Sequence, residues 1–263
     1  MDAYATADAG GSDTAGAKAT ATAIGDGTGG TVQATASSTP QGQTTRAPTL
    51  INSIQALASA EVGTSATAFA ETLYGAAVPA FDSTDAAVGT GVAAPDAADT
   101  NPVLAANGAI NTAFGASPSF FSMGEVGGGH ASAAGGAESS TASVTTAINL
   151  ADPGASGNLV FGLYGGAAVG SGVTGVTLTV TGNGATYLNE AFGSGAAAQA
   201  GFTDQAFNFG ALGSSGVLDL VVSLTVQTDQ SGSGFYGDFV AGDPPGGGAG
   251  VLHPAAAALL AHW

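Results

Sequence analysis

A strict alternation of apolar and polar residues in the second half of the chain constrains the fold more than any other feature. Val176, Leu178 and Val180 alternate with threonines, and every second residue from Leu218 to Val226 is Leu or Val. A period of two is typical of β-strands with one buried face. The strand-like runs lie at 158–164, 173–181, 185–191, 217–227 and 234–240. They predict an all-β fold, an antiparallel, jelly-roll-like β-sandwich over residues 115–243.

Turn residues separate these runs. The link Thr181-Gly-Asn-Gly184 tolerates positive φ, so residues 173–181 and 185–192 are predicted to form a hairpin. Asp152-Pro-Gly154 is a predicted turn. Two more strands are expected at 119–123 and 140–150, joined by a Gly-rich connection around residues 127–130. One helical turn over 194–200, capped by Ser194, precedes a strand at 202–209.

The region 46–114 is predicted to be a linker that contains Ala-rich helices and one strand, after a Pro-containing stretch at 38–48. Leu50, Ile51, Ile54 and Leu57 recur at helical spacing, which predicts a short helix over about 49–60. A strand is expected at 65–71. A second helix is expected at 101–114, with Pro102 near its first turn and Gly108 weakening it.

Residues 1–45 contain a small repeat. Tyr4-Ala-Thr-Ala, Lys18-Ala-Thr-Ala and Gln33-Ala-Thr-Ala follow one another at intervals of 14 and 15 residues. Short alternating strands at a fixed period predict rungs of a β-solenoid, each stacked on the next. The alternative is a disordered, low-complexity Ala/Thr/Gly segment. At the other end, residues 244–263 are expected to form an irregular tail.

The charge balance excludes several partners. Lys18 and Arg46 are the only basic residues against 19 acidic ones, and the net charge is −17. Nucleic acid is excluded as a partner because its affinity comes largely from Lys and Arg at phosphates, and an anionic membrane surface is disfavoured. The sequence has no cysteine and no run of eighteen apolar residues that could span a bilayer. No cleavable export signal is recognisable at the start, so either the sequence is part of a longer chain or export takes another route.

We assign no catalytic residue and no metal ligand, and expect that the protein is not an enzyme. His130, His253 and His262 are scattered, and Gly193-Ser-Gly195 lacks the strand-to-helix context of a nucleophile elbow. Calcium is the one cofactor left open, because acidic β-proteins often bind it through carboxylates. The candidate ligands are Asp26 in a Gly-rich turn and Asp152, Asp229, Asp238 and Asp243 at predicted strand ends. A plain role in turns is the simpler interpretation.

Four aromatic residues are candidates for a binding surface. Tyr164, Tyr187, Phe235 and Tyr236 lie in strand-like runs, where a platform of rings could stack against sugars. The alternative is that these rings fill the core. Gly165, Gly166 and Gly237 beside them indicate tight turns or close backbone approach.

Several segments resemble a known kind of protein. The order of residues 101–115, 156–166, 196–204 and 232–239 is similar to the C-terminal module of large bacterial secreted, adhesin-like β-repeat proteins, in which Ala-Thr repeats precede the module. The resemblance covers roughly residues 1–243 and brings no catalytic residues with it. It implies a protein of the cell surface or the extracellular space.

These observations predict a non-enzymatic secreted or cell-surface protein with a structural or adhesive role. Few charges protect the edges of its predicted sheets, and unprotected edges favour self-association into matrix or fibres. The partners we expect are other copies of the chain, components of the cell surface or extracellular matrix, and glycans. The alternative function is that of a carbohydrate-binding β-sandwich module.

Overall fold

The computed structural model describes the backbone of residues 2–9, 16–25, 31–39, 51–62, 66–74, 87–93, 95, 97–129, 137–150, 158–211, 215–230 and 232–244; the side chains that it describes lie between residues 87 and 244. The strands are β1 (Asp2–Ala9), β2 (Gly16–Gly25), β3 (Thr31–Thr39), β4 (Ile51–Val62), β5 (Ala66–Tyr74), β6 (Ala87–Ala93), β7 (Ser119–Gly129), β8 (Glu138–Asn149), β9 (Asn158–Val169), β10 (Val173–Gly182), β11 (Ala185–Phe192), β12 (Gln205–Ala211), β13 (Val217–Thr228) and β14 (Gly234–Asp243). The helices are α1 (Ala97–Ala106), α2 (Gly108–Phe114) and α3 (Gly195–Gly201).

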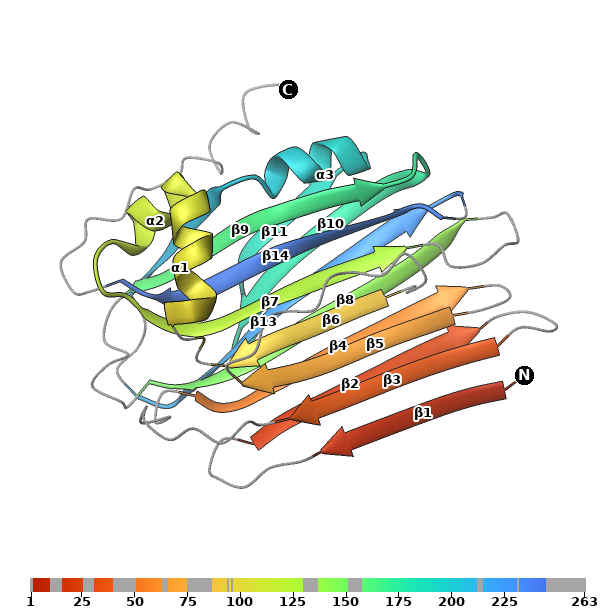
Figure 1. Ribbon diagram of the computed structural model, residues 1–263, viewed down its shortest axis with the longest axis horizontal. Helices are drawn as coiled ribbons and strands as arrows, with labels where there is room; N and C mark the ends of the chain where they lie inside the picture. Colours follow the sequence, from red (N-terminus) through yellow and green to blue (C-terminus); the bar gives the residue numbers. More distant parts are fainter. Residues whose placement is uncertain are drawn as a thin grey trace.

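The chain is mostly β, and two antiparallel sheets pack together as a β-sandwich with three short helices. In the sandwich, the first sheet contributes five strands in the order β6-β7-β14-β9-β12, and the second contributes four in the order β11-β10-β13-β8. Figure 1 shows that α1 and α2 lie on the outer face of the first sheet. The predicted sandwich is therefore confirmed at the level of two packed sheets.

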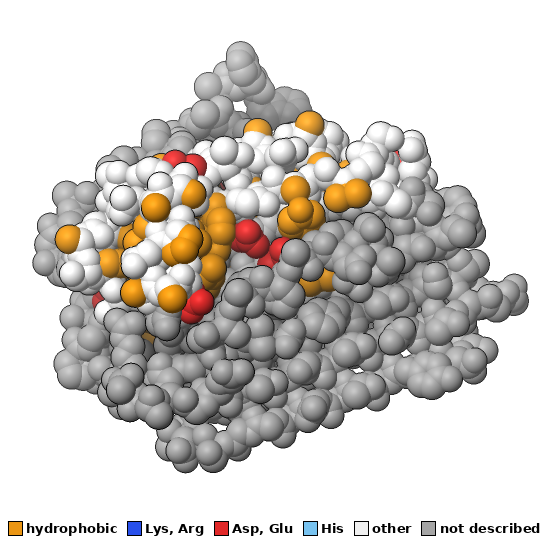
Figure 2. Space-filling view, in the orientation of Figure 1, with side chains coloured by type: hydrophobic (Ala, Val, Ile, Leu, Met, Phe, Trp, Pro, Cys, Tyr) orange, Lys and Arg blue, Asp and Glu red, His pale blue; other side chains and the backbone are white. Residues whose placement is uncertain are grey.

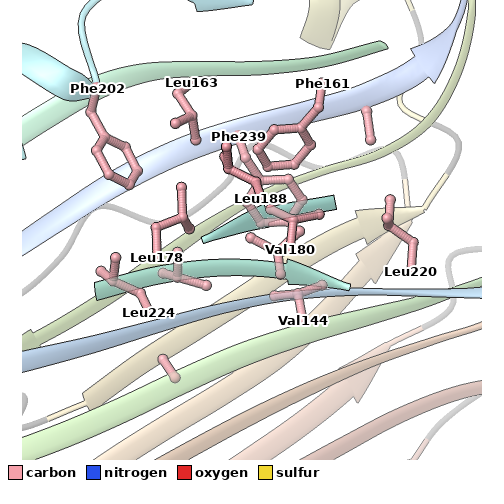
Figure 3. Close-up of a cluster of buried hydrophobic side chains, with 14 of the residues drawn as sticks. Val144, Phe161, Leu163, Leu178, Val180, Leu188, Phe202, Leu220, Leu224 and Phe239 are labelled. Carbon is pink, nitrogen blue, oxygen red and sulfur yellow. The ribbon is translucent and has the colours of Figure 1, made fainter. Parts of the chain in front are cut away.

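The alternation that predicted the strands produces the core between the sheets. On β13, Leu218, Leu220, Val222, Leu224 and Val226 are all buried, and β10 contributes Val176, Leu178 and Val180. Figure 3 shows these two strands facing Phe161 and Leu163 of β9 and Phe239 of β14. On the opposite face of the second sheet, the hydroxyls of Thr141 and Thr225 are hydrogen-bonded across the strands at 2.9 Å.

The predicted hairpin between β10 and β11 is confirmed. Asn183 and Gly184 both have positive φ, 50° and 83°, as a tight hairpin turn whose twist matches its strands requires. The Asn183 amide also ties the turn to β13: Nδ2 donates to the Val217 carbonyl at 2.8 Å, and Oδ1 accepts from the Asp219 N–H at 2.9 Å.

Strand β7 is longer than predicted, because the glycines after Val126 continue the strand instead of forming a connection. A Cβ at Gly127 would lie 2.8 Å from the Cβ of Tyr236 on β14. A Cβ at Gly128 would meet the Ser140 hydroxyl of the facing sheet. These two glycines allow close packing, which local sequence cannot distinguish from a turn.

The helix expected over about 49–60 is wrong, since these residues form strand β4, which pairs with β2 in parallel and with β8 antiparallel. The strand expected at 65–71 is confirmed as β5. The helix expected over 101–114 forms as α1 and α2, interrupted at Asn107. It begins four residues early, at Ala97, so Pro102 lies inside α1 and not near its first turn.

The N-terminal strands continue both sheets. β1, β3 and β5 extend the first sheet in parallel to β6, and β2 and β4 extend the second from β8. The repeats are in register, with Tyr4 opposite Gln33 and Gln33 opposite Thr67, while Lys18 lies opposite Gln55 in the other sheet. Consecutive repeats therefore alternate between sheets, and the expectation that each stacks directly on the next is wrong.

Helix α3 and strand β12 follow the prediction closely. The Ser194 hydroxyl accepts from the Ala197 N–H at 3.2 Å, which confirms the N-cap. β12 begins at Gln205, three residues later than expected, because α3 continues to Gly201. The predicted turn at Asp152–Gly154, the stretch at 40–48, the tail after Pro244, and Asp26, His130, His253 and His262 lie outside the described residues.

Candidate functional site

The four aromatic residues singled out in the sequence do not form one surface. The Phe235 ring lies in the core between the sheets, fully buried. Tyr187 packs at the border of the same core, with its ring 5.2 Å from that of Phe209. Tyr164 is buried beneath the helices on the outer face of the first sheet, and Tyr236 is half-buried on that face. Whether any of them binds a sugar stays a prediction.

The outer face of the first sheet carries a row of polar groups that crosses three strands. Asp238 of β14 lies opposite Glu125 of β7 on one side and opposite Tyr164 of β9 on the other. Directly opposite residues of an antiparallel pair share a face, with Cβ atoms about 4.5–5.5 Å apart. Glu125 is only 3 % exposed. We call Glu125, Asp238 and Tyr164 the outer-face row.

A bulge in β9 gives the Asp238 carboxyl group its space. The pairing of β14 with β9 shifts between Tyr236 and Asp238, beside Gly165, whose φ is +64°. A Cβ on Gly165 would collide with the Asp238 carboxylate. Gly166 and Gly237 make room on the inner face. A Cβ on Gly166 would collide with the Cβ of Phe202, and a Cβ on Gly237 would collide with its ring. The glycines noted in the sequence thus permit close approach on both faces.

Helices α1 and α2 cover one end of this row. They and the sheet form a second, smaller core of Val103, Ile110, Phe114, Phe120, Met123, Val160, Tyr164 and Val240. The rings of Phe114 and Phe120 are 5.0 Å apart. Figure 2 shows acidic side chains at the middle of this face, between two groups of hydrophobic side chains. Acidic groups on this face therefore lie beside hydrophobic ones, and Tyr164 of the row belongs to the apolar layer.

Burial dominates the electrostatics of the outer-face row. It raises the pKa of Asp238 from 3.8 to about 7, because removal from water disfavours the charged form. Burial also raises the pKa of the Tyr164 hydroxyl well above its usual value, and the nearby carboxylates of Asp238, Glu125 and Asp99 raise it further. Tyr164 is therefore a neutral hydroxyl at physiological pH.

The other residues considered as nucleophiles or calcium ligands have structural roles or do not lie close together. Ser194 does stand between a strand and a helix, contrary to the prediction, but its hydroxyl caps α3 and its backbone is extended, with φ −164°. A nucleophile elbow needs a sharp, strained turn instead. Asp229 is exposed at the end of β13, whereas Asp238 lies inside β14 and not at a turn. Among the described residues, no group of three or more His, Cys, Asp or Glu side chains could hold a metal.

The sequence interpretation missed Glu125 and Asp99. Glu125 is the single charged residue in the stretch 119–129, and a charge inside an otherwise uncharged strand is a usable signal for a buried polar site. Asp99 precedes the expected start of its helix, so its approach to Tyr164 depends on the early beginning of α1. No described helix is long and apolar enough to cross a membrane.

The chain matches no protein-family model and no curated protein. The evidence for its function therefore comes from its own residues and their arrangement.

Proposed function

We propose that this is a non-enzymatic structural or adhesive protein of the cell surface or extracellular space, which associates with copies of itself through its N-terminal edge strands. In this proposal the parallel strands form a short two-sheet β-solenoid that continues into a jelly-roll-like sandwich. The resemblance of four segments to secreted, adhesin-like β-repeat proteins supports the same role.

The two ends of the sheets differ in how regularly their edge strands are paired, and this difference is the main support for the proposal. β1 pairs with β3 over eight consecutive residues and β2 pairs with β4 over ten, both without a shift in register. Among the described strands, each is the last in its sheet. A long, regular edge strand leaves a row of backbone groups available to pair with another chain.

The opposite edges are interrupted. The pairing of β12 with β9 shifts after Asn208, Gly210 has a φ of +90°, and its N–H donates to the Asn208 side chain at 2.8 Å. The pairing of β11 with β10 also shifts, between Val180 and Thr181. Irregularities of this kind discourage edge-to-edge pairing. The N-terminal edges are therefore favoured for association.

The charges on the edge strands favour one arrangement. β1 contains Asp2 and Asp8, whereas the only charge on β2 is Lys18. Like charges on neighbouring strands are destabilising and opposite charges stabilising. A two-fold axis parallel to the strands would place β1 of each copy beside β2 of the other, so that both edges are satisfied in one closed dimer.

Proline substitutions in β1 test this association. Successive residues of an edge strand direct their N–H groups alternately toward the neighbouring strand and away from it, and proline removes an N–H. We expect sedimentation velocity to detect concentration-dependent association of the full chain. Of Ala5→Pro and Thr6→Pro, one should abolish association and keep the Tm that the wild type has when it is dilute and monomeric. The other should lower the Tm below that value. A chain that stays monomeric at every concentration would contradict the proposal.

Carbohydrate binding is the second candidate function, because Tyr236 is partly exposed on the same face and strand as Asp238. A ring beside a carboxyl group suits the apolar face and the hydroxyls of a sugar. A glycan array should detect a saturable signal that Tyr236→Ala abolishes and Tyr187→Ala, on the other sheet, preserves. A blank array, or a signal that survives in Tyr236→Ala, would count against this candidate.

A further inference from the structure

The acidic groups of the outer-face row lie beside one another without a described basic neighbour. Asp238 faces Glu125 on β7 and Tyr164 on β9, and Asp99 of α1 lies close enough to Tyr164 to raise its pKa. On the far side of Glu125, the position opposite it on β6 is Thr90. No Lys, Arg or His occurs among the residues whose side chains are described. Ionisation of Asp238 therefore adds a negative charge beside Glu125 without a described cation.

Within the row, Tyr164 connects the sheet to its helical cover. Tyr164 contacts the apolar layer that contains Val103 of α1 and Ile110 and Phe114 of α2. The Asp238 side chain is half-buried between its cross-strand neighbours and lies beside the bulge at Gly165. A charge at Asp238 consequently changes the environment of β14 directly and that of the helices through Tyr164.

We propose that Asp238 forms a pH-sensitive contact, which holds β14 and the α1–α2 cover against the sheet when its carboxyl group is protonated and loosens them when it ionises. The device is independent of the proposed self-association, since β1 and β2 lie at the far end of the sheets.

The direction of the effect follows from the pKa of Asp238, which burial raises from 3.8 to about 7. A group whose pKa is higher in the folded state stabilises that state below its unfolded pKa, and this contribution is lost as pH rises through the folded pKa. The contact is therefore complete near pH 4 and is lost progressively up to about pH 7. Between pH 5 and pH 8, these two pKa values correspond to about a hundredfold rise in the equilibrium constant for opening.

Hydrogen–deuterium exchange of the full chain tests the proposal. After correction for intrinsic exchange rates, amide protection in α1 and β14 should fall about a hundredfold from pH 5 to pH 8 in the wild type. In Asp238→Asn the amide protection of α1 and β14 should change less than threefold between pH 5 and pH 8. The matched control Asp219→Asn, which removes an equally negative but exposed side chain of β13, should behave as the wild type.

Two results would overturn the proposal: protection in α1 and β14 that is independent of pH in the wild type, or an equal loss in the wild type and Asp238→Asn. If Asp238→Asn does not fold, carbon-13 NMR of the aspartate carboxyl groups in the wild type decides instead. A carboxyl group assigned to Asp238 should then titrate near pH 7, and a midpoint below pH 5 would refute the contact.

Discussion

Asp204 holds helix α2 in place from outside the helix. Its carboxylate accepts from the Ala109 N–H, at 3.0 Å to Oδ1 and 2.9 Å to Oδ2, and from the Ile110 N–H at 3.1 Å. The N-cap residue Asn107 makes no side-chain cap, because its Nδ2 donates to the Val103 carbonyl of α1 at 2.8 Å. Asp204 also has a φ of +47°. It therefore supplies from the α3–β12 connection the anionic cap that α2 lacks.

We expect Asp204→Ala to destabilise the protein by about 2 kcal/mol, since it removes hydrogen bonds from a charged acceptor and places alanine at positive φ. Asp204→Asn keeps one acceptor oxygen and tolerates this conformation, so its cost should be less than about 1 kcal/mol. Urea denaturation measures both, with Asp219→Ala as an exposed control. If Asp204→Ala and Asp219→Ala lower the free energy of unfolding equally, Asp204 does not stabilise helix α2.

The outer-face row shows how far single residues can be interpreted from a sequence. In Phe235-Tyr-Gly-Asp-Phe239, a period of two places Tyr236 and Asp238 on the face opposite Phe235 and Phe239, as observed. The sequence alone does not pair Asp238 with Glu125 and Tyr164, because that neighbourhood depends on the order β7-β14-β9 and on the bulge at Gly165. Local periodicity determines the face of a residue, and topology determines its neighbours.

Strands were predictable where β-branched and aliphatic residues alternate with threonine, as in β10 and β13. Strand β4 was not, because Ile51, Ile54, Leu57 and Ala58 fit a helical spacing while Ile54, Ala56, Ala58 and Ala60 fit a period of two equally well. Alanine favours helix locally. Two neighbouring strands, β2 and β8, supply the hydrogen bonds that make this segment a strand instead.

The helical segment before β7 was predictable in kind but not in its boundaries. Pro102 lies in the middle of α1, although proline is best tolerated in a first turn. Val103 packs against the sheet together with Ile110 and Phe114 of α2, and this packing offsets the destabilising effect of proline inside α1. The extended backbone of Asn107 separates the two helices, and α2 begins at Gly108.

The molecule as a whole combines two ways of building a sheet. From β6 onward the strands are antiparallel and enclose the main core, whereas the five strands before β6 pair in parallel, apart from the β4–β8 junction. Consecutive repeats of the N-terminal strands alternate between the two sheets, and β1 pairs with β3, Asp2 opposite Thr31. One complete turn of the chain through both sheets therefore takes two repeats. The sequence period of 14–15 residues is therefore half the structural period.

Cysteine pairs measure this arrangement directly, because the chain contains no cysteine of its own. Thr6 lies opposite Thr35 on neighbouring strands of one sheet, whereas Thr20 belongs to the other sheet and lies opposite Leu57. Neighbouring strands are about 4.8 Å apart, within the Cα separation of about 4.4–6.8 Å that a disulfide needs. Mild oxidation should therefore cross-link the double variant Thr6→Cys/Thr35→Cys within one chain and leave Thr6→Cys/Thr20→Cys reduced. Efficient cross-linking of the Thr6–Thr20 pair, with none for Thr6–Thr35, would contradict the alternating two-sheet arrangement.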